Sequence, residues 1–62
     1  MYQAGDRIEL IRMDNDPNPI APGTRGVIDF VNVMHDMTQI GVQWANGRKL
    51  MLVLPDDIIK KI

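Results

Sequence analysis

Acidic and amide side chains alternate at Asp14, Asp16 and Asn18, a spacing of oxygen ligands that is typical of calcium-binding loops. An EF-hand loop also needs glycine at its sixth position for a sharp turn and glutamate at its twelfth for bidentate binding. Counted from Asp14, those positions hold Pro19 and Arg25. The sequence therefore argues against a calcium site, and we expect these side chains to hydrogen-bond their own backbone in Asx-turns.

The single histidine, His35, precedes Asp36, and a histidine beside a carboxylate can act as a general base. No nucleophile or metal ligand accompanies the pair, because the chain has no cysteine and the nearest threonine is Thr38. A glycine-rich phosphate loop is also absent. We therefore expect no enzyme activity, with no catalytic residue, no metal, no cofactor and no small-molecule substrate, and we interpret His35 as a solvent-facing residue of a hairpin.

Three basic residues, Arg25, Arg48 and Lys49, are candidates for nucleic-acid contact. Arginine forks onto phosphate oxygens, and small β-barrels bind nucleic acid in this way. The three residues lie where the second strand begins and beside an Asn-Gly turn, and a barrel could bring these places together, with Arg7 or Arg12 adding to the patch. The competing interpretation is ordinary solvated charge, paired across strands with acidic neighbours.

Methionine is abundant, with five in 62 residues, and exposed methionines form adaptable contact surfaces. The segment KLMLVL, residues 49–54, is apolar on both faces, unlike a strand that is buried on one side only. It is either central in a closed barrel or in contact with another chain. Core filling would also explain the methionines. The candidate protein-contact residues are Met34, Met37, Met51 and Val53.

The length allows one domain, residues 1–62, and a chain this short buries only about 60% of the surface that its unfolded form exposes. Without cysteine the disulfide route to stability is closed, which leaves unusually good packing or oligomerisation. The formal net charge of −1 gives no global attraction to nucleic acid or to an anionic membrane. The start shows no signal peptide and no run is long enough to span a bilayer, so we expect a cytoplasmic protein.

Alternation with a period of two predicts strands over residues 6–13 and 38–44, and β-branched and aromatic residues predict a strand over residues 24–33, with Phe30 and Trp44 on the core side. Residues 14–23 hold three prolines and lack periodicity, so they form a long first loop. Gly26 indicates a bulge or a close backbone approach. Asn46 and Gly47 predict a type I′ turn leading into a strand over residues 49–54.

Pro55, Asp56 and Asp57 interrupt the apolar run, and we expect a single helical turn there. The last residues, 58–62, fit a helical turn and a strand about equally well, and we favour a strand that pairs with the first. Together these elements predict an all-β fold, a small partly open five-stranded barrel in which closure removes most exposed edges.

Three segments, GDRIELIRM, PGTRGVI and IGVQWANGRKLMLVLPDD, together resemble a family of small uncharacterised proteins of bacteriophages and mobile elements. The resemblance covers nearly the whole chain and implies an SH3-like barrel. It implies no activity, and its shared positions are architectural, so no functional residue follows from it. The GDR opening and residues 23–28 are also distantly similar to the KOW motif of ribosomal and transcription-elongation proteins.

These observations favour a non-enzymatic interaction module of phage or mobile-element origin, which buries an apolar face against a second copy or a host protein. The alternative is a nucleic-acid-binding, KOW-like barrel that uses Arg25, Arg48 and Lys49. Such binding weakens steeply with salt, by a slope that counts the phosphates contacted.

Overall fold

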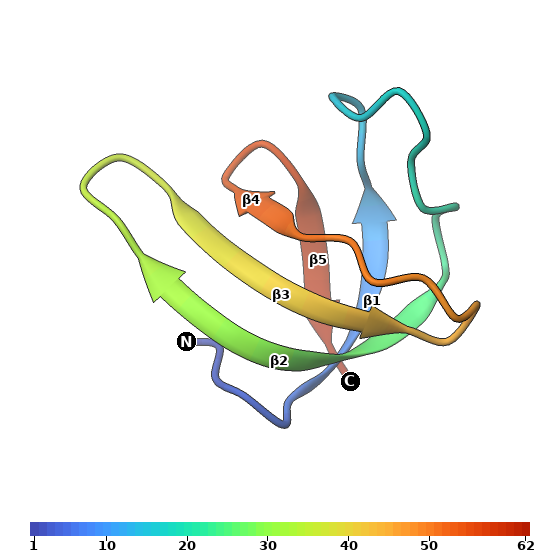
Figure 1. Cartoon of the computed structure of the whole chain (residues 1–62), viewed down its shortest axis with the longest axis horizontal. Coiled ribbons are helices and arrows are strands. Elements are labelled where there is room, and N and C mark those ends of the chain that lie inside the picture. The colour runs from blue at the N-terminus through green and yellow to red at the C-terminus, as the bar shows by residue number, and fades with distance from the viewer.

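The computed structural model describes all residues from 1 to 62. Its strands form one five-stranded antiparallel sheet (Figure 1). Its strands are β1 (Arg7–Arg12), β2 (Arg25–Val33), β3 (Thr38–Trp44), β4 (Leu52–Leu54) and β5 (Ile58–Lys61). The strand order is β4-β3-β2-β1-β5. The all-β prediction is confirmed, including the pairing of the last strand with the first. No helix long and apolar enough to cross a membrane is present.

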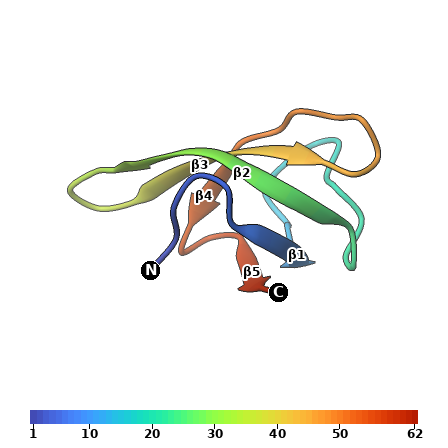
Figure 2. The same ribbon diagram turned by 90° about the horizontal axis from the view of Figure 1, so that it is seen from below.

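The sheet curls around a core but does not close into a barrel. In Figure 2, β4 and β5 lie on the same side of the long β2–β3 hairpin. These two strands are the two edges of the sheet and are not paired with each other, so edges remain that a closed barrel would remove. The space that they enclose holds nine buried apolar side chains: Ile8, Leu10, Met13, Ile20, Ile28, Ile40, Val42, Trp44 and Leu52.

The long first loop is held against this core by apolar anchors and backbone bonds. Ile20 is fully buried, and its N–H donates to the sulfur of Met13 at 3.4 Å. At the predicted Asx-turn, Asp16 Oδ1 accepts from the Asn18 N–H at 2.8 Å. Asp14 instead pairs with Arg12. The loop is therefore a well-packed bend whose acidic side chains are used locally.

The predicted strand over residues 49–54 is too long, because only Leu52–Leu54 pair with β3 beyond an isolated bridge at Lys49. Between them, the Leu50 carbonyl accepts a bond from Trp44 Nε1 at 3.1 Å, which draws the chain out of the ladder. The strand is also not central, since β4 is an edge of the sheet. Only Leu52 within β4 is fully buried.

Two local predictions were wrong. The β3–β4 connection is not a type I′ turn, which needs positive φ at both central residues, because Gly47 alone has it (φ 90°). Gly47 N–H bonds Trp44 O, and Trp44 N–H bonds Arg48 O, as in a three-residue loop with glycine in the left-handed region. The expected helical turn at residues 55–57 is absent: these residues form a turn in which Asp57 N–H bonds Val53 O, after a cis Leu54-Pro55 bond.

Candidate functional site

An apolar groove lies beside the far end of the β2–β3 hairpin, with a volume of about 350 Å³. Five of its six lining residues are hydrophobic, and Val33 among them is 76% exposed. We name it the hairpin groove; its residues are Met1, Tyr2, Val31, Val33, Thr38 and Leu54. Val31 pairs with the buried Ile40, so its side chain is on the inner face of the sheet, where the groove continues from the core.

A second depression of about 360 Å³ adjoins the hairpin groove and shares Thr38 and Leu54 with it. Met34 and Met37 line it, together with the connection between β2 and β3. His35 is exposed in that connection, as predicted. The fold therefore places two of the four candidate protein-contact residues, Met34 and Met37, in a mixed polar and apolar depression that adjoins the hairpin groove.

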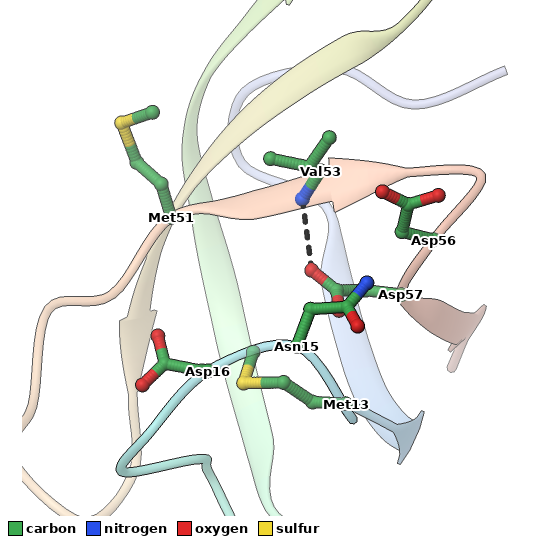
Figure 3. Close-up of a pocket in the computed structure, with 7 residues that line it drawn as sticks. All are labelled: Met13, Asn15, Asp16, Met51, Val53, Asp56 and Asp57. Atoms are coloured by element: carbon green, nitrogen blue, oxygen red, sulfur yellow. Dashed lines mark hydrogen bonds between the residues drawn. The ribbon is translucent and has the colours of Figure 1, made fainter.

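The other two candidates, Met51 and Val53, line a smaller hollow of about 170 Å³ under β4 (Figure 3). Its remaining walls are polar or come from the first loop: Met13, Asn15, Asp16, Asp56 and Asp57. We name it the acidic hollow. Its lining shares no residue with the hairpin groove, so the four methionine and valine candidates do not form one surface.

Asp57 in the acidic hollow protects the edge of the sheet. Its carboxylate accepts a bond from the Val53 N–H at 2.9 Å (Figure 3). The Asp57 N–H donates to the Val53 carbonyl. Both backbone groups that Val53 turns away from β3 are therefore satisfied. An edge strand with unpaired N–H and C=O groups can pair with a strand of another chain, and Asp57 prevents such pairing at Val53 of β4.

We expect Asp57→Ala to lower the free energy of unfolding by about 1–2 kcal/mol, because Asp57 is only 8% exposed and its loss leaves the Val53 N–H without an acceptor. Urea denaturation followed by circular dichroism measures this change. The neighbouring Asp56→Ala is the control, since Asp56 is exposed, and it should alter stability by less than about 0.5 kcal/mol. Equal effects of the two substitutions would show that the bond to Val53 does not matter.

The outer face of the sheet carries the basic residues. Arg7, Val27, Gln43 and Lys49 are consecutive cross-strand partners and so form one row on this face. Arg7 and Arg25 line the same depression of about 320 Å³. Glu9 lies beside Arg25, with Oε1 at 3.4 Å from Arg25 Nε, and its Oε2 is 3.6 Å from Lys60 Nζ.

The predicted basic triad is only partly gathered. Arg25 and Lys49 belong to the outer face, whereas the Arg48 guanidinium donates to the Asn18 carbonyl at 2.8 Å and thereby holds the first loop. Arg7, which the sequence offered only as an addition, is a closer companion of Arg25. Lys60 was not predicted at all, because it comes from the other end of the chain and reaches this face only through the β1–β5 pairing.

An ion pair near Tyr2 ties the two ends of the chain together. Lys61 Nζ lies 3.2 Å from Asp6 Oδ2, donates to the Met1 carbonyl and is 5.8 Å from the centre of the Tyr2 ring. The pKa of Asp6 is lowered, first by the hydrogen bond from the Gln3 N–H and then by Lys61, although partial burial opposes both. These contacts fix the position of the first residues, which form one wall of the hairpin groove.

A carboxyl whose pKa is lower in the folded state than in the unfolded chain stabilises the fold fully above the unfolded value, about 3.9. That contribution from Asp6 should disappear as the pH falls below about 4 and through the lower, folded-state pKa. An NMR titration of the carboxyl carbon measures it. We expect Lys61→Gln to raise the Asp6 pKa only partly, since the Gln3 N–H remains, and an unchanged pKa would contradict the role of Lys61.

The site thus consists of an apolar groove and a basic outer face on a small, open, all-β sheet, which defines the class as a small β domain. A family model described as "Domain of unknown function (DUF4314)" matches residues 1–62, and the chain belongs to this family. No curated protein and no solved structure gives a significant match to the chain.

Proposed function

We propose that this protein is a non-enzymatic interaction module with an SH3-like fold, which binds a protein partner through the hairpin groove. The partner is a second copy or a protein of the host cell. The resemblance of the GDR, PG-x-x-G and W-x-NG-R segments to phage and mobile-element proteins supports an origin of that kind. A cytoplasmic location agrees with this proposal.

The observation that carries the proposal is the continuity of the hairpin groove with the depression at Met34 and Met37. The two hollows meet at Thr38 and Leu54 and leave Val33 and Met34 substantially exposed, and the polar side chains of His35 and Asp36 border the second hollow. The hairpin groove itself is mostly apolar, and the largest exposed apolar patch on a small protein is often a contact site. Methionines at its border suit it to irregular partners, because their side chains adapt to different shapes.

The proposal is tested by selecting binding peptides from a displayed random library and titrating the best one into ¹⁵N-labelled protein. We expect shifts in the amide signals of Tyr2, Val33, Thr38 and Leu54. Met37→Glu should weaken binding at least about tenfold, which is a loss of about 1.4 kcal/mol. Met51→Glu is the matched control in the acidic hollow and should leave affinity unchanged. Peptides that bind elsewhere, or none at all in a protein that also does not self-associate, would contradict the proposal.

A second candidate function, nucleic-acid binding, is favoured by the alignment of Arg7, Gln43 and Lys49 in one row, with Arg25 beside it. These side chains come from different strands but share the outer face, opposite the core. The pairing of Glu9 with Arg25 and Lys60 weakens this candidate, because it places a negative charge beside the row and pairs Arg25 and Lys60 with it. It therefore ranks below protein binding.

An NMR titration with single-stranded DNA and with RNA at low salt tests this second candidate. Binding through the outer face should shift the amides of Arg7, Val27 and Gln43, and the affinity should fall steeply with added salt. Arg7→Gln together with Arg25→Gln should reduce affinity at least about tenfold, whereas Arg48→Gln, in the β3–β4 connection and bonded to the first loop, should have little effect. The absence of shifts at low salt would exclude it.

A further inference from the structure

The end of β2 has a free backbone edge beside the hairpin groove. Strand β1 pairs with β2 only at Arg25, Gly26 and Val27. Just before β1, the Gly5 N–H donates to the Ile28 carbonyl and the Ile28 N–H donates to the Asp6 carbonyl. On its other side, β2 pairs with β3 as far as Val33. The residues of β2 beyond Ile28 therefore have a neighbouring strand on one side only (Figure 1).

The direction of the backbone groups follows from the hydrogen bonds at both ends of this segment. The Met34 N–H donates to the Met37 carbonyl, so the N–H and C=O groups of Met34 point across the hairpin, toward the β3 side. These groups alternate in direction along a strand, so those of Val33 and Val31 point away from β3. At the other end, Ile28 faces β1, and the bulge between Ile28 and Phe30 changes the alternation so that Val31 again faces outward. Outside the strand ladders neither Val31 nor Val33 takes part in a backbone hydrogen bond, and β1 has no partner for either residue.

This edge lacks the features that usually prevent pairing between chains. Natural edge strands carry lysine, proline or an inward-facing charge, but the sequence from Phe30 to Met34, FVNVM, has none of them. The edge of β4, by contrast, is protected by Asp57. The chain also has a net charge of only −1, so two copies repel each other weakly.

The segment is complementary to itself across a two-fold axis at Asn32. Antiparallel pairing about that axis sets Val31 opposite Val33 of a second copy. The outward N–H of each of these residues then donates to the outward carbonyl of the other. It also sets Phe30, 45% exposed, opposite Met34, 43% exposed, a favourable contact of sulfur with an aromatic ring. The inner faces of the two sheets then join, and the valines of both copies meet beside the two hairpin grooves.

We propose that the occupant of this edge is a second copy of the chain, paired antiparallel through Val31 and Val33 so that two five-stranded sheets become one. This inference rests on the proposed function, because it names the partner of the same apolar surface. A standard interface takes about 800 Å² from each partner, roughly a fifth of the 4102 Å² surface of this chain. So short a strand buries less, and we expect a dissociation constant on the order of 100 µM.

Sedimentation equilibrium of the full chain tests the dimer. The weight-average mass should rise from 7.0 kDa toward twice that value as the concentration approaches about 1 mM, ten times the expected dissociation constant. Val33→Lys should weaken association at least about tenfold, because it adds a charge at the edge where the side chain is already 76% exposed. Val33→Pro removes the outward N–H, and no bond to β3 is lost with it, so it should have the same effect. Met51→Lys, at an exposed position outside the hairpin groove, is the control and should associate normally.

Isotope-filtered NOEs in a mixture of labelled and unlabelled protein should join Val31 of one copy to Val33 of the other. A protein that stays at 7.0 kDa at about 1 mM, or one whose Val33 variants associate like the wild type, would overturn the dimer. If such a monomer still binds the selected peptide in the hairpin groove, the proposed function stands without the dimer. If it binds no peptide either, both are wrong.

Discussion

Trp44→Ala should leave the protein unfolded at room temperature. The Trp44 side chain is 3% exposed at the centre of the core, and its indole N–H donates to the Leu50 carbonyl at 3.1 Å. Truncation of a buried tryptophan to alanine costs about 3–5 kcal/mol. A domain of this size without disulfides rarely has more than about 3–5 kcal/mol of stability. Far-UV circular dichroism and the dispersion of amide NMR signals measure the loss, since the substitution removes the fluorescent residue.

Two other aromatic substitutions separate burial from hydrogen bonding. Trp44→Phe keeps most of the ring but leaves the Leu50 carbonyl without its donor, so we expect a loss of about 1–2 kcal/mol in a folded protein. Phe30→Ala removes a ring that is 45% exposed and should cost about 1 kcal/mol or less. A folded Trp44→Ala variant with native signal dispersion would contradict the central place of Trp44 in the core.

The sequence was sufficient to predict where most strands lie, because side chains alternate with a period of two over residues 6–13 and 38–44, and residues 24–33 are rich in β-branched and aromatic side chains. It placed Trp44 in the core correctly and Phe30 wrongly, for one reason. The bulge between Ile28 and Phe30 inserts a residue opposite β3, and everything after it changes face. No residue type marks this bulge, so simple alternation from Ile28 predicts the wrong side for Phe30.

The candidate site was less predictable, because tertiary contacts assemble it. The methionine pattern pointed to Met34 and Met37, but nothing in MYQ at the start indicates that Met1 and Tyr2 wall the same groove. Their place depends on Lys61 and Asp6, which lie at opposite ends of the chain. Arg48 likewise looked like part of a basic patch from its position beside a turn, and only the folded first loop supplies the Asn18 carbonyl that it binds.

Gly26→Ala should destabilise the fold by about 2–3 kcal/mol, a large part of its total stability. A β-carbon at Gly26 would lie 2.6 Å from Val42 Cγ1 and 2.9 Å from the Gln43 carbonyl oxygen, and that oxygen belongs to the backbone of the adjacent strand. This explains the glycine by close backbone approach rather than by a bulge, the other expectation from the sequence. The midpoint of urea denaturation, at an unchanged slope, measures the loss.

Gly41→Ala is the matched control for Gly26→Ala, because the three atoms nearest to its β-carbon would all belong to the ring of Phe30, a half-exposed side chain that can swing into solvent. We expect it to cost about 1 kcal/mol or less. Its cost should vanish in the background of Phe30→Ala, where the obstructing ring is gone, whereas the cost of Gly26→Ala should persist in that background. If Gly26→Ala lowers the free energy of unfolding as little as Gly41→Ala does, the β2 and β3 backbones can separate at Gly26. The register of the hairpin would then not depend on a glycine at this position.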